Sequence, residues 1–115
     1  MTAAGAVKRL QEMARQYGAP VKLQLPTGGC GSAGCMGYHP VETLIAHPDG
    51  RLEYCESPYG VHSVVQPFPA LRRVGVVEAE KYAARMLRKA RRVLRHPCLS
   101  WAEVLGTAVE VLERD

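Results

Sequence analysis

The chain has 115 residues, a formal net charge of +4, 47% hydrophobic residues and 23% charged residues. This length supports one domain with one core, and the composition is that of an ordinary globular protein, which excludes a disordered chain. No apolar run approaches the roughly 20 residues needed to span a bilayer, and the N-terminal charges follow the small-residue run, the wrong order for a secretory signal. We therefore expect a cytoplasmic protein with no membrane partner.

The first part of the chain predicts a helix and then a strand. In residues 3–17 the apolar residues recur at steps of three and four, and Gly18 followed by Pro20 gives a stop signal. Residues 21–25 then alternate apolar and polar side chains, as a strand with one buried face does.

Residues 41–56 predict a β-hairpin. Two short runs, 41–46 and 51–56, flank the turn sequence His-Pro-Asp-Gly at 47–50. The hairpin register should return Cys55 toward the start of the first of these strands and so toward the glycine-rich loop before it. Residues 61–66 are predicted as a fourth strand at a sheet edge.

Two helices are predicted after the strands. Residues 76–95 place alanine, leucine and valine on one side and basic residues on the other. Residues 100–114 begin with a capping box formed by Ser100 and Glu103. The chain should therefore form a single α+β domain (1–115) with an N-terminal helix, an antiparallel sheet of three to four strands, and two C-terminal helices packed on the sheet.

The loop at residues 27–40 is the main candidate site, because it contains five glycines, two cysteines and a histidine. Glycine leaves the backbone uncovered, and thiolate and imidazole are the ligands that zinc prefers. With Cys55 returned by the hairpin, a Cys₃His structural zinc site can be assembled. Its proposed ligands are Cys30, Cys35, His39 and Cys55.

Other readings of the same loop remain open. The spacing of Cys30 and Cys35 resembles the first two cysteines of a plant-type ferredoxin loop, which would imply an iron–sulfur cluster, but the third cysteine of that pattern falls at Tyr38. The cysteines can also be reduced core or thiol redox residues. A dinucleotide-binding loop is excluded, because Gly37 and Pro40 interrupt the helix that such a loop must open.

The predicted helix 76–95 is the second candidate site. Residues 72–95 hold nine of the fifteen Lys and Arg residues, and acidic partners one turn away are nearly absent. A basic helical stripe can track the phosphates of a nucleic acid, although charged helix faces are also commonly just solvated. The residues proposed to contact nucleic acid are Lys81, Arg85, Arg88, Lys89, Arg92 and Arg95.

These features favour a small non-enzymatic, zinc-binding accessory or regulatory module that contacts nucleic acid. The alternatives are a small iron–sulfur or thiol redox protein, and an adaptor that binds an acidic protein partner.

Overall fold

The computed structural model describes residues 1–28, 41–57 and 71–112. The remainder of the glycine-rich loop and the strand predicted at 61–66 lie outside these described residues. Within them, the helices and strands in chain order are α1 (Ala3–Tyr17), β1 (Val21–Pro26), β2 (Val41–Ala46), β3 (Leu52–Ser57), β4 (Arg72–Val74), α2 (Val76–Val93), α3 (Trp101–Thr107) and β5 (Val109–Val111).

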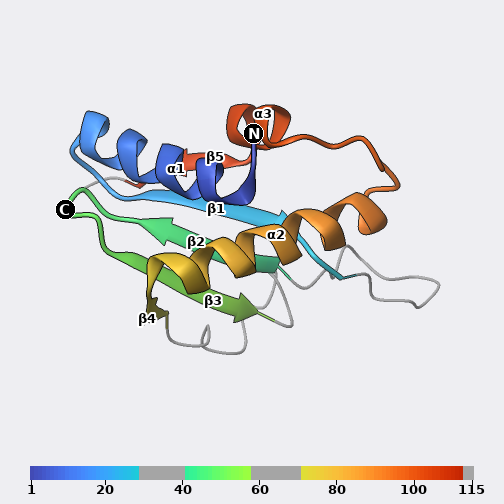
Figure 1. Cartoon of the computed structure of the whole chain (residues 1–115), viewed down its shortest axis with the longest axis horizontal. Helices are drawn as coiled ribbons and strands as arrows, with labels where there is room; N and C mark the ends of the chain where they lie inside the picture. The colour runs from blue at the N-terminus through green and yellow to red at the C-terminus, as the bar shows by residue number, and fades with distance from the viewer. Residues whose placement is uncertain (29–40, 58–70, 113–115) are drawn as a thin grey trace.

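The strands of the described ranges form one antiparallel sheet in the order β4-β3-β2-β1-β5. Helices α1 and α2 lie side by side across the same face of this sheet, and α3 sits beside α1 (Figure 1). The predicted α+β architecture is therefore confirmed. None of the helices in the described ranges is long and apolar enough to cross a bilayer.

The core lies between the sheet and the two long helices. In β1, Val21, Leu23 and Leu25 are buried, whereas the residues between them are partly exposed, so the alternation in the sequence places one face against the helices. Leu10 of α1 and Met86 of α2 are fully buried against this face. Burial of these apolar faces supplies most of the stability of such a layer.

The first helix and the hairpin match their predictions. Thr2 caps α1, whose first turn has Gly5 N–H donating to the Thr2 Oγ1 at 3.1 Å, and Gly18 ends it in the left-handed conformation with φ of 62°. In the hairpin turn, Gly50 has φ of 91°, a conformation that favours glycine. The hairpin register pairs Cys55 with Thr43.

The C-terminal segment differs from its prediction as a single helix over 100–114. Ser100 does cap α3, accepting a hydrogen bond from the Glu103 N–H at 3.3 Å, but the helix ends at Thr107. Residues 109–111 instead form β5, with Val109 opposite Leu23 of β1. The prediction was wrong here because Ala108, Val109 and Leu112 continue the helical spacing of Val104 and Leu105 past the end of the helix. In the folded sheet, β1 has one edge that β2 does not cover, and residues 109–111 form a strand because they pair with that edge.

Two further features were not predicted: the end of the second helix and a short strand before it. The second helix ends at Val93, and Arg95 beyond it has φ of 52°, so the chain leaves the helical conformation before residue 95. The three-residue strand β4 was missed, because a strand this short carries little periodicity.

The two glycines Gly50 and Gly106 should respond oppositely to replacement by alanine. Neither would bring a Cβ atom within 4 Å of another group, but only Gly50 has positive φ. Gly50→Ala should lower the free energy of unfolding by about 1 kcal/mol through backbone strain, and Gly106→Ala should raise it by about 0.5 kcal/mol through helix propensity. Urea denaturation of both variants measures this. An equal response at the two sites would contradict the assigned turn.

Candidate functional site

The proposed metal ligands are only partly within the described residues. Cys30, Cys35 and His39 lie outside them. Cys55 lies on β3, 7% exposed, and points to the sheet face opposite the helices. Burial, together with the charge of Glu56, raises the pKa of its thiol. No group of three or more metal-ligating side chains converges within the described ranges, so the zinc site stays a prediction.

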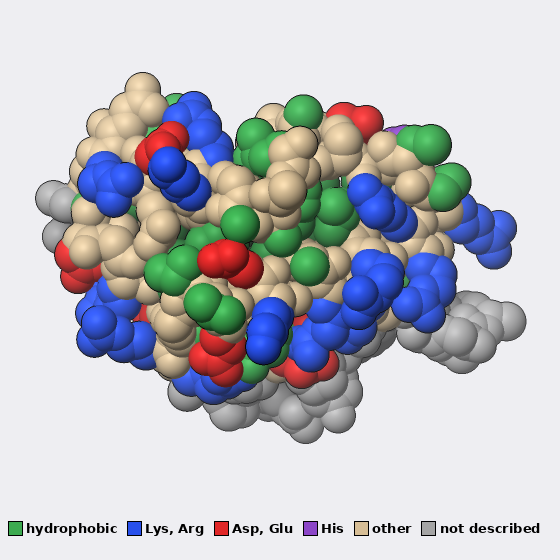
Figure 2. All heavy atoms as spheres, viewed as in Figure 1, with side chains coloured by type: hydrophobic (Ala, Val, Ile, Leu, Met, Phe, Trp, Pro, Cys, Tyr) green, Lys and Arg blue, Asp and Glu red, His purple; other side chains and the backbone are tan. Residues whose placement is uncertain are grey.

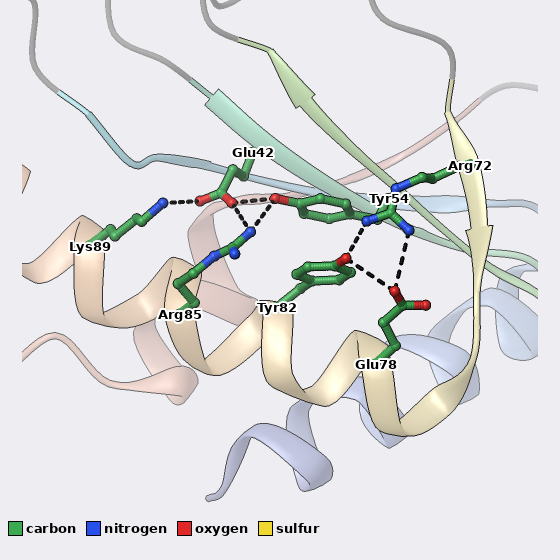
Figure 3. Close-up of polar contacts among 7 residues, drawn as sticks. All are labelled: Glu42, Tyr54, Arg72, Glu78, Tyr82, Arg85 and Lys89. Atoms are coloured by element: carbon green, nitrogen blue, oxygen red, sulfur yellow. Dashed lines mark hydrogen bonds and ion pairs between the residues drawn. The ribbon is translucent and has the colours of Figure 1, made fainter.

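A buried carboxylate, which sequence reasoning missed, organises the sheet surface under α2. Glu42 lies on β2 with its side chain fully buried, facing the helix layer as Leu44 does. Arg85 Nη2 donates to its Oε1 at 2.8 Å, and Lys89 Nζ lies 3.7 Å from its Oε2. The Tyr54 hydroxyl from β3 donates to the same Oε1 (Figure 3). One acidic side chain thus gathers two helical cations and a neighbouring strand.

The surroundings of Glu42 keep it ionised. Burial alone would raise its pKa, but hydrogen bonds from Tyr54, Arg85 and Thr27 and the charge of Lys89 outweigh burial, so the pKa is lowered. For Tyr54, burial and the adjacent carboxylate raise the pKa, which keeps its hydroxyl protonated as a donor. The centre therefore combines one carboxylate, one neutral phenol and two cations, which leaves one positive charge in excess.

A second polar group continues from this centre toward the start of α2. The rings of Tyr54 and Tyr82 stack with centroids 4.0 Å apart and planes inclined by 6°. Arg72 of β4 lies near both rings and donates to the Tyr82 hydroxyl and, at 3.3 Å, to Glu78 Oε2 (Figure 3). Strands β2, β3 and β4 are thereby tied to one side of α2, which fixes how the helix is rotated about its axis.

This rotation divides the basic residues proposed to contact nucleic acid. Arg85 and Lys89 turn toward the sheet and pair with Glu42. The acidic partners that the helix itself lacks are therefore supplied by a strand 43 and 47 positions earlier in the chain. A signal for this existed in the sequence, since Glu42 alternates with Leu44 and Ala46 and so places a charge on the apolar face of its strand.

The other basic residues face outward. Lys81, Arg88 and Arg92 are exposed on α2, and Arg95 is exposed beyond its end. Among the residues that the structure describes, none of these four forms an ion pair, whereas the neighbouring Arg91 donates to the Leu99 carbonyl. Figure 2 shows Lys and Arg side chains gathered along the C-terminal half of α2 on this face of the molecule. We call Lys81, Arg88 and Arg92 the exposed basic face.

Comparison with known proteins gives no relative: no family model, no curated protein and no solved structure matches the chain.

The Glu42 centre generates a prediction about stability. Glu42→Gln should lower the free energy of unfolding at neutral pH by about 3 kcal/mol, because it leaves partly buried cations without their counter-charge. The lowered pKa means that the ionised carboxylate stabilises the fold above its ordinary pKa of 4.5 and loses this effect as the pH falls through the folded value. The difference between wild type and variant should therefore shrink in acid. Urea denaturation at neutral pH and well below pH 4.5 measures both effects.

Glu78→Gln is the matched control for this experiment. Glu78 also pairs with an arginine, but its side chain is 46% exposed, so solvent screens the pair and the change in stability should be small at both pH values. An equal loss in the two variants would contradict the assignment of Glu42 as the centre.

Proposed function

We propose that this protein is a non-enzymatic accessory module that binds nucleic acid through the exposed basic face of α2. The observation that carries the proposal is a row of three exposed cations, Lys81, Arg88 and Arg92, without ion-pair partners among the described residues. The row spans about 16 Å along the helix, at about 1.5 Å per residue. A row of this kind suits the regularly spaced phosphates of a nucleic acid strand.

The rigidity of α2 supports this proposal. Arg85 is held by Glu42 at 2.8 Å, and Tyr82 is stacked on Tyr54, so the middle of the helix is anchored to the sheet. Cations on a fixed helix lose less conformational freedom on binding than cations on a mobile segment, and more of the attraction appears as affinity.

Salt dependence tests the nucleic-acid proposal. Arg88→Ala combined with Arg92→Ala should weaken binding of a labelled oligonucleotide and reduce the slope of log affinity against log salt by about 1.4 for single strands or about 1.8 for duplexes. Fluorescence anisotropy across a salt series measures both quantities. The control is Lys8→Ala combined with Arg15→Ala, which removes the same charge from exposed positions of α1.

Two outcomes would overturn the proposal in different ways. Equal losses in the two double variants would mean that net charge, and not the exposed basic face, governs binding. Absence of binding to any oligonucleotide, with retained binding to a polyglutamate chain, would favour the adaptor for an acidic protein partner.

We also propose a structural zinc ion held by Cys30, Cys35, His39 and Cys55. One feature of the sheet supports it: Pro26 pairs with Val41, and Val41 pairs with Ser57. The chain therefore leaves β1 and re-enters at β2 at the same end of the sheet as the end of β3, and Val41 lies opposite Ser57, two residues from Cys55. Zinc would deprotonate that thiol on binding.

Elemental analysis of freshly purified protein tests the metal proposal. We expect about one equivalent of zinc in a colourless sample, as a single four-ligand site requires. Cys30→Ser combined with Cys35→Ser should lose the metal, and Cys98→Ser, at an exposed cysteine outside the proposed ligands, should keep it. A brown sample containing iron would favour the iron–sulfur alternative, and a metal-free sample would contradict both.

A further inference from the structure

A shallow pocket lies where the end of β1 meets the C-terminal half of α2. It has a volume of about 220 Å³ and is lined by Thr27, Gly28, Lys89, Arg92 and Val93. Pockets that enclose drug-sized ligands usually measure about 300–1,000 Å³. This pocket therefore suits a single compact group rather than a complete nucleotide.

The charges around the pocket favour an anion. Both long side chains in its wall, Lys89 and Arg92, are cationic, and the wall itself contains no acidic residue. The carboxylate that Lys89 faces, Glu42, is fully buried and already accepts a hydrogen bond from Arg85 at 2.8 Å. The pocket therefore keeps a net positive potential.

Lys89 can serve both the carboxylate and the pocket. Its Nζ lies 3.7 Å from Glu42 Oε2, longer than the roughly 2.7–2.9 Å of a charge-assisted hydrogen bond, so the ammonium group is not locked onto Glu42. Lysine carries three donors on a flexible stem, and arginine offers a planar fork that matches two phosphate oxygens. The two side chains together supply a point charge and a bidentate clamp.

We propose that this pocket is a phosphate-binding subsite, with Arg92 as the clamp, Lys89 as the second cation and Val93 as the wall that limits the size of the group. The phosphate is an internal phosphodiester of the nucleic acid that follows the exposed basic face, a part of the inference that rests on the function proposed above. Arg92 belongs both to that face and to the pocket, so a strand lying along Lys81 and Arg88 reaches the pocket at its end. The subsite fixes the register of the strand on α2.

Titration with inorganic phosphate, followed by amide NMR, tests the subsite. Saturable shifts should centre on Thr27, Gly28, Arg92 and Val93, and sodium chloride at equal ionic strength should not reproduce them. Arg92→Gln should weaken phosphate binding by about tenfold, because glutamine removes the charge and keeps at most one of the two hydrogen bonds of the clamp. Arg88→Gln is the matched control, since it removes the same charge one turn away and outside the pocket wall.

A second variant separates shape from charge. Val93→Phe adds volume at the pocket wall without changing the net charge, and it should also weaken phosphate binding while thermal unfolding reports that the fold is retained. Shifts that never saturate, or equal losses in Arg88→Gln and Arg92→Gln, would overturn the subsite.

Oligonucleotide binding to the same proteins separates this inference from the function on which it rests. Saturable phosphate binding without oligonucleotide binding would support a phosphate site and overturn its assignment to a nucleic-acid backbone. Oligonucleotide binding that is insensitive to Val93→Phe, with no phosphate shifts at the pocket, would overturn the subsite and leave the exposed basic face as the contact. A loss of oligonucleotide affinity in Val93→Phe, together with the phosphate shifts, supports both.

Discussion

The ionised carboxylate of Glu42, buried between sheet and helix, is the constraint on which the arrangement of α2 depends. A buried charge is costly unless it is paired, and here two cations from α2 and a phenol hydroxyl from β3 converge on it. Their geometry permits only one rotation of α2 over the sheet. Because Arg85 and Lys89 face Glu42, they do not belong to the solvent-exposed row of cations. The pairing therefore leaves Lys81, Arg88 and Arg92 as the exposed basic residues of α2.

The basic residues of α2 that face the sheet and those that face solvent therefore have different roles. The inward cations hold the layer together, and the stacked Tyr54 and Tyr82 extend that contact toward β4. The outward cations Lys81, Arg88 and Arg92 keep their charge available to a partner. Lys89 stands at the boundary, since it neutralises Glu42 and lines the pocket beside Arg92. The structural and the proposed binding functions of α2 therefore meet at one side chain.

Elements formed by interactions between residues close in the sequence were predicted correctly, and an element formed by distant residues was not. Helix α1 has its cap and its stop within the chain segment itself, at Thr2 and Gly18, and the hairpin has its turn at residues 47–50, so local sequence was sufficient. Strand β5 depends on the free edge of β1, 86 to 90 residues earlier, whereas Val109 and Leu112 locally continue a helical spacing. For the candidate site, the basic residues were visible in the sequence, but their partner Glu42 was not considered.

The sequence by itself determined the α+β class, the first helix, the hairpin and the concentration of positive charge on the second long helix, because periodicity, caps and turn residues act over a few positions. Only the tertiary structure decided that residues 109–111 form a strand, that Arg85 and Lys89 face a carboxylate, and that Arg92 shares a pocket with Thr27 and Gly28. Each of these depends on groups from distant segments meeting at one place. For Glu42, burying the carboxylate without a partner would be costly, so the fold requires Arg85, Lys89 and Tyr54 beside it.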